Sequence, residues 1–189
     1  VRGATLMGLP GRPSSSRTRY LTRFALLLAV ATILHVVEAS FPPPLPLPGA
    51  KLGLANIVSL VCLTVLGLRS ALLLTVLRTI LGSLLQGSLL GFGFVLSFGA
   101  GLASTLAMGV LRYGFGGRFS LVGVSLFGAL IHNLTQLALA GLVVSHFGII
   151  SYLPYMLLGS LPTGAMTGLV AIAALNARGA ALQRWLTAD

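Results

Sequence analysis

Long apolar stretches dominate this chain and restrict what it can fold into. Each is close to or above the roughly 20 residues that cross a bilayer as a helix. The six stretches run over residues 21–39, 52–68, 70–88, 92–111, 121–145 and 149–176. Only 7% of all residues are charged, so too few polar side chains exist to cover a water-soluble domain. The sequence therefore predicts an all-α membrane protein, a bundle of six transmembrane helices.

The distribution of cations predicts how this bundle is oriented. Ten of the 12 lysines and arginines flank the stretches on the side of both termini, Lys51 lies on the other side, and Arg78 lies inside the third stretch. Cytoplasmic loops accumulate Lys and Arg, so both termini are predicted to be cytoplasmic. Residues 1–18 are expected to form a flexible basic tail, 19–177 the transmembrane domain, and 178–189 a short cytoplasmic tail.

Two connections are distinctive. Residues 67–70 alone separate the second and third stretches, which predicts a tight helical hairpin. On the opposite side, residues 41–48 contain five prolines, which favour an extended chain and cannot continue a helix. This segment is interpreted either as a stiff connector or as a lid over a substrate.

The scarcity of acids and cysteines excludes several function classes. Glu38 and Asp189 are the two carboxylate side chains, too few for paired-carboxylate catalysis, a calcium cage or a carboxylate-held magnesium diphosphate. The single cysteine, Cys62, excludes an internal disulfide and a multi-cysteine metal site. The cations are scattered between apolar runs, unlike a nucleic-acid-binding face. We therefore expect no metal, no cofactor and no nucleic-acid partner.

Polar residues inside the apolar stretches form the candidate ligand site. A charge at mid-bilayer costs about 2.5–3.5 kcal/mol on insertion scales, so such residues usually face the bundle interior or water. The candidates are Glu38, Lys51, Asn56, Arg78, His132, Asn133 and Gln136. In one interpretation, Arg78 and Lys51 hold an anionic ligand in a cavity of the outer half, and the amides of the fifth stretch orient it.

A structural interpretation of the same residues stays open. Glu38 and Lys51 would then form an interfacial ion pair, and Arg78 would cap backbone carbonyls and pair with Glu38. His132, Asn133 and Gln136 would form interhelical hydrogen bonds, as polar residues in membranes often do.

Small residues at four-residue spacing predict close helix packing. Gly164 and Gly168 have this spacing in the sixth stretch, and Ala25 and Ala29 have it in the first. Ala25 and Ala29 are interpreted alternatively as a flat face for a partner helix.

Three segments together resemble a known family. They are KLGLAN at 51–56, RTILG at 78–82 and HNLTQ at 132–136, with Glu38 preceding the proline-rich segment. Over about residues 19–176 the chain is similar to the bacterial Gx transporter family, also called heptaprenyl diphosphate synthase component I. That family resembles the substrate-binding S components of energy-coupling-factor transporters, which have six membrane helices. The resemblance implies a multi-pass protein of the bacterial cytoplasmic membrane, whose AxxxA face at Ala25 and Ala29 docks on a coupling protein.

The resemblance leaves three functions open. In the first, the chain is a transport subunit that captures a small anionic cofactor precursor or isoprenoid-related ligand. Without a Walker A sequence it would depend on partner ATPases and an energy-coupling membrane protein. In the second, it is a non-catalytic accessory subunit of a soluble prenyl diphosphate synthase, because it lacks the aspartate-rich magnesium motifs of prenyl transfer. In the third, it is a membrane component of a quinone- or flavin-linked electron-transfer locus. None of the three makes the chain alone an enzyme.

Overall fold

The computed structural model describes residues 15–41, 53–145 and 147–176, and all secondary structure in these ranges is helical. The order is α1 (Ser15–Ser40), α2 (Leu54–Leu66), α3 (Leu68–Leu85), α4 (Phe92–Gly114), α5 (Leu121–Val144), the short 3-10 helix η1 (Phe147–Tyr152) and α6 (Leu153–Asn176). Lys51, the prolines of the 41–48 segment, most of the first predicted tail and all of the second lie outside the described residues. Helix α1 starts at Ser15, ahead of the predicted domain boundary at residue 19.

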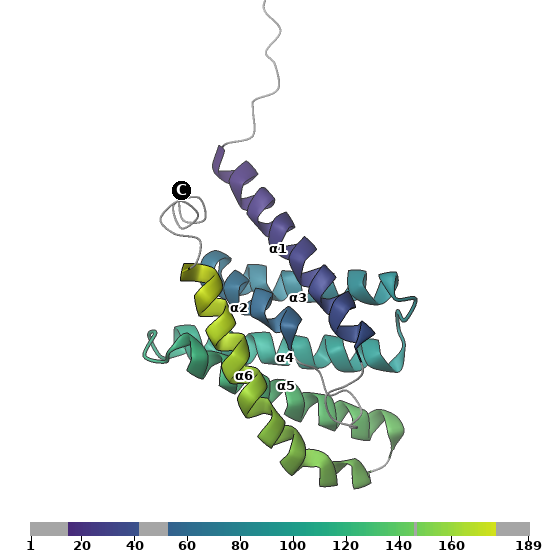
Figure 1. Cartoon of the computed structure of the whole chain (residues 1–189). Coiled ribbons are helices and arrows are strands. Elements are labelled where there is room, and N and C mark those ends of the chain that lie inside the picture. The colour runs from purple at the N-terminus through teal and green to yellow at the C-terminus, as the bar shows by residue number, and fades with distance from the viewer. Residues whose placement is uncertain (1–14, 42–52, 146, 177–189) are drawn as a thin grey trace, which may run out of the picture.

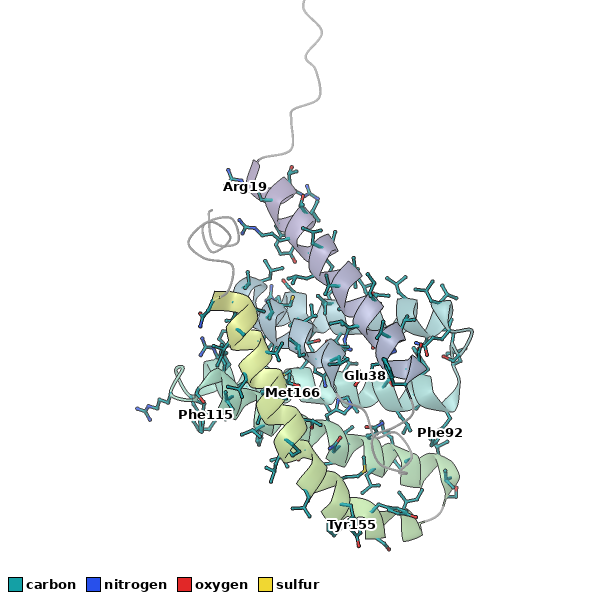
Figure 2. All side chains as sticks on the ribbon, viewed as in Figure 1. Arg19, Glu38, Phe92, Phe115, Tyr155 and Met166 are labelled. Carbon is teal, nitrogen blue, oxygen red and sulfur yellow. The ribbon has the colours of Figure 1, made fainter. Side chains whose placement is uncertain are left out.

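The chain runs back and forth between two ends of the bundle (Figure 1). The start of α1, the α2–α3 and α4–α5 connections and the end of α6 lie at one end; the α3–α4 connection and η1 lie at the other. Figure 2 shows this separation through Arg19 and Phe115 at the first end and Phe92 and Tyr155 at the second. Apart from Arg78, the arginines of the described part lie toward the first end: Arg17, Arg19 and Arg23 in the first part of α1, Arg69 at the start of α3, Arg112 near the end of α4 and Arg118 in the α4–α5 connection.

Five of the helices are long and apolar enough to cross a membrane, namely α1, α3, α4, α5 and α6. Helix α2 has 13 residues, which gives a length of about 20 Å against a hydrocarbon core of about 30 Å. Six membrane spans were predicted, and five of the described helices have the length and hydropathy of a span. The last apolar stretch, residues 149–176, is longer than α6 because its first residues form η1 before α6 begins.

Apolar packing and small residues hold the bundle together. Helix α5 packs extensively on α4 and α6, while α1 packs on α2 and α3. An added Cβ would lie 2.9 Å from the Leu126 Cα at Gly164 and 2.7 Å from the Val122 Cα at Gly168. The backbones of α5 and α6 are thus in close contact, which confirms the packing predicted from the glycine spacing.

A chain of hydroxyl groups crosses the centre of the bundle beside this apolar packing. Thr75 of α3 contacts the Ser59 hydroxyl of α2 at 3.3 Å and the Thr105 hydroxyl of α4 at 3.0 Å. All three residues are buried. Arg78 lies one helical turn after Thr75 on the same helix, so the hydroxyl contacts of Thr75 help to hold Arg78 in place between α2 and α4.

Candidate functional site

Two neighbouring, partly open cavities lie between the helices. The charged cavity has about 280 Å³ of space between its atoms, open space at its mouth included, and is lined by His35, Glu38, Gly53, Asn56, Arg78, Ser97 and His132. The hydroxyl cavity has about 390 Å³ of such space and is lined by Gly53, Asn56, Ser104, Met108, Ser125, Ala129, His132, Asn133, Thr163 and Thr167. Gly53, Asn56 and His132 line both, so the two cavities adjoin at these residues.

Arg78 provides the positive charge of the charged cavity. It lies within α3, and only 3% of its surface is exposed. Its Nη2 donates a hydrogen bond of 2.9 Å to the Asn56 Oδ1, and its Nε has no hydrogen-bond partner among the described residues. An added Cβ at Gly101 of α4 would lie 3.6 Å from the Arg78 Nη2. The guanidinium therefore faces the bundle interior and keeps one donor unused.

Glu38 provides the negative charge at the same cavity. It lies near the end of α1, is 8% exposed and attracts Arg78 electrostatically. Its Oε1 accepts a hydrogen bond from the backbone N–H of Gly53. Gly53 caps the start of α2 with φ of +79°, a left-handed conformation that favours glycine. The Glu38 carboxyl group thus lies at the start of α2 and lines the same cavity as Arg78.

The polar residues of α5 divide between three environments. His132 lines both cavities, and Asn133 lines the hydroxyl cavity. The Asn133 Nδ2 also donates to the Met156 carbonyl of α6 at 2.9 Å, which is the interhelical contact foreseen in the structural interpretation. Gln136 is 1% exposed and lines neither cavity. The structure thus brings Glu38, Asn56, Arg78 and His132 together, with Asn133 beside them and Gln136 apart.

Several lining residues were not predicted from the sequence. His35 and Ser97 complete the charged cavity, and Gly82 of α3 leaves space for the His35 ring. His35 could have been predicted from the sequence, because it lies three residues before Glu38 and hence on the same face of α1. The serines and threonines of the hydroxyl cavity have no such signal, since hydroxyl residues are common throughout these helices.

Ala25 and Ala29 lie on a different side of α1 from the cavity residues. Both are exposed, as are Leu26, Ile33 and Val37, whereas His35 and Glu38 are buried. This face of α1 is therefore open to lipid or to a partner helix. Among the described residues, no group of three or more His, Cys, Asp or Glu side chains is placed to hold a metal ion.

The comparison with known families covers the part of the chain that carries this site. No curated protein and no solved structure was found to match the chain. The family model described as heptaprenyl diphosphate synthase component I matches residues 27–174, a range that includes every residue lining the two cavities. The resemblance seen in the sequence is thereby confirmed, and the chain belongs to the heptaprenyl diphosphate synthase component I family.

Proposed function

We propose that this chain is a membrane-embedded binding subunit that takes a small anionic ligand into the charged cavity and works with partner proteins. In this proposal the chain passes the bacterial cytoplasmic membrane six times, with both termini in the cytoplasm. Helix α2 and residues outside the described ranges together make the second passage. The concentration of arginines at one end of the bundle supports this orientation.

The observation that carries the proposal is the buried arginine at the wall of a cavity. Burying a guanidinium is unfavourable unless its donors are satisfied, and Asn56 satisfies Nη2 while Nε stays without a partner among the described residues. A carboxylate or phosphate accepts charge-assisted hydrogen bonds from such a group. An anionic ligand would therefore accept the hydrogen bond that the Arg78 Nε does not make to any described residue.

The chain is proposed to act without catalysing a reaction itself. It has two carboxylates and no Walker A sequence, so energy or chemistry would come from partners. One partner arrangement is an energy-coupling membrane protein with ATPases, for which the exposed Ala25 and Ala29 would provide the docking face. The other is a soluble prenyl diphosphate synthase, which the family's description as a synthase component favours.

Native mass spectrometry of the full chain, purified in detergent, tests the binding function. The wild-type protein is expected to retain a small molecule, and Arg78→Met to lose it while remaining monodisperse. Arg69→Met is the matched control, because Arg69 lies on the same helix but is exposed. Equal retention by Arg78→Met and Arg69→Met would refute the site.

Co-purification from native membranes distinguishes the two partner arrangements. Recovery of coupling ATPases supports the transport role, and recovery of a soluble prenyl diphosphate synthase supports the accessory role. An Ala25→Leu, Ala29→Leu variant is expected to lose a coupling protein that docks on α1, without changing ligand retention.

A further inference from the structure

We infer that the ligand has two chemically different parts: an anionic group held at Arg78 in the charged cavity, and a hydroxyl- or amide-bearing body held in the hydroxyl cavity. The ligand is therefore not a molecule with a hydrocarbon body. This inference rests on the proposed binding function and specifies the class of ligand.

Seven of the ten residues that line the hydroxyl cavity carry side chains able to form hydrogen bonds, beside apolar atoms that include those of Met108 and Ala129. Four of its residues carry hydroxyls, namely Ser104, Ser125, Thr163 and Thr167, and Asn56, His132 and Asn133 add polar nitrogen or oxygen atoms. Hydrocarbon placed against such groups would remove water from them without returning hydrogen bonds, which is unfavourable. A body with its own hydroxyl or amide groups would replace that water.

Ser125 of α5 shows that one of these hydroxyls is available. Serine and threonine in helices commonly donate to the carbonyl four residues earlier, as Thr64, Thr79 and Thr105 do here. Ser125 is 2% exposed, lines the hydroxyl cavity, and its Oγ has no hydrogen-bond partner among the described residues. Buried polar atoms are rarely left in this state, so the hydroxyl indicates a partner that the described residues do not supply.

One residue lining each cavity thus has a buried polar atom without a hydrogen-bond partner among the described residues, and the two atoms differ in kind. The Arg78 Nε is a charged donor, whereas the Ser125 Oγ is neutral and either donates or accepts. Because Gly53, Asn56 and His132 line both cavities, a single molecule lying beside these three residues would occupy both. Glu38 lines the same cavity as Arg78, so its negative charge favours an anion of low charge over one with several charges.

Two matched pairs of probes test this ligand class on the detergent-purified full chain. Gluconate and hexanoate are both six-carbon carboxylates, but only gluconate has a hydroxylated body. Ribose 5-phosphate and isopentenyl phosphate form the corresponding five-carbon phosphate pair. Isothermal titration at matched concentrations is expected to show binding of the hydroxylated member at least about 5-fold tighter than its hydrocarbon partner, in one pair or both. The pair that binds more tightly identifies the anionic group.

Two serine variants test whether Ser125 causes the tighter binding of hydroxylated probes. Ser125→Ala is expected to weaken binding of the hydroxylated probe by roughly 5-fold, the effect of one neutral hydrogen bond, and to leave the hydrocarbon probe unchanged. Ser160→Ala is the control, because Ser160 is fully buried but donates to its own helix at Leu157 and lines neither cavity. It is expected to change neither affinity.

The outcomes separate the two levels of the proposal. Equal or tighter binding of hexanoate and isopentenyl phosphate would overturn the inferred ligand class and leave the binding function standing. Equal losses in Ser125→Ala and Ser160→Ala would overturn the role of Ser125. Binding of none of the four probes, together with no retained molecule in the wild-type protein, would overturn the proposed function itself.

Discussion

Gly82 lies where α3 passes the His35 side chain, and replacing it with alanine should force that ring to move. An ideal Cβ at Gly82 would lie 2.4 Å from the His35 Cδ2, 3.1 Å from Cγ and 3.3 Å from Nε2. Ordinary contacts of this kind begin at 3.4 Å. His35 is only 6% exposed and lines the charged cavity, so its ring would shift into that cavity.

The expected change in stability is the sum of two opposing effects. Overpacking a well-packed interior costs about 1–3 kcal/mol. Alanine is favoured over glycine inside a helix by about 1 kcal/mol, so Gly82→Ala should be destabilised by about 0–2 kcal/mol. Gly93→Ala is the control, because an added Cβ there meets nothing within 4 Å. It should be stabilised by about 0.5–1 kcal/mol, and the difference between the two variants isolates the clash.

The native cysteine supplies the assay. Cys62 is the only cysteine in the chain and is 0% exposed, so a maleimide should label it only after the bundle opens. Labelling along a titration with sodium dodecyl sulfate gives an unfolding midpoint for each variant. Gly82→Ala should open earlier than Gly93→Ala, whereas in a His35→Ala background, which lacks the ring, the two glycine substitutions should shift the midpoint by similar amounts. Equal midpoints, or a Gly82→Ala effect that persists in the His35→Ala background, would refute the reasoning.

Three further predictions concern the site, the orientation and the packing. Arg78→Lys keeps the charge but not the guanidinium geometry, so native mass spectrometry should show at least about a 10-fold loss of retained ligand; unchanged retention would contradict a direct guanidinium contact. In a background without the native cysteine, an impermeant maleimide should label Ser88→Cys from outside and Gly114→Cys from the cytoplasm, and the reverse pattern would contradict the proposed orientation. Gly168→Val should lower the free energy of unfolding by about 1–3 kcal/mol because the new side chain presses on the α5 backbone. Gly141→Ala is the control, because its Cβ meets nothing within 4 Å, and it should not lower stability. Similar unfolding midpoints for the two variants would count against the close α5–α6 contact.

The sequence predicted the helices well because apolar length alone determines them. Five of the predicted stretches became helices that can cross a membrane. The length of α2 was not predictable in this way. Hydropathy treats residues 52–68 as one apolar run, whereas Gly53 and Gly67 both adopt positive φ and bound a helix of 13 residues. A hydropathy window carries no information about backbone conformation.

The site was predicted in part, and charge explains which part. Glu38, Asn56, Arg78 and His132 were predicted together and line one cavity, because polar groups in apolar helices seek each other or water. Ser125 was missed because a serine that bonds to its own helix and one that faces a cavity have the same local sequence pattern. The side chain's environment depends on the packing of α4 and α6 around it, which one helix does not encode.

The single-residue connection at Gly67 has a consequence for how the protein is made. Gly67 alone joins α2 to α3, with φ of +86° and ψ of 175°. No free loop exists there to let α2 settle in the bilayer while α3 is still being synthesised. Helix α2 is also too short to cross the hydrocarbon core alone. We therefore expect the two helices to leave the insertion machinery as one pair, and a ribosome stalled before α3 emerges to hold α2 outside the lipid.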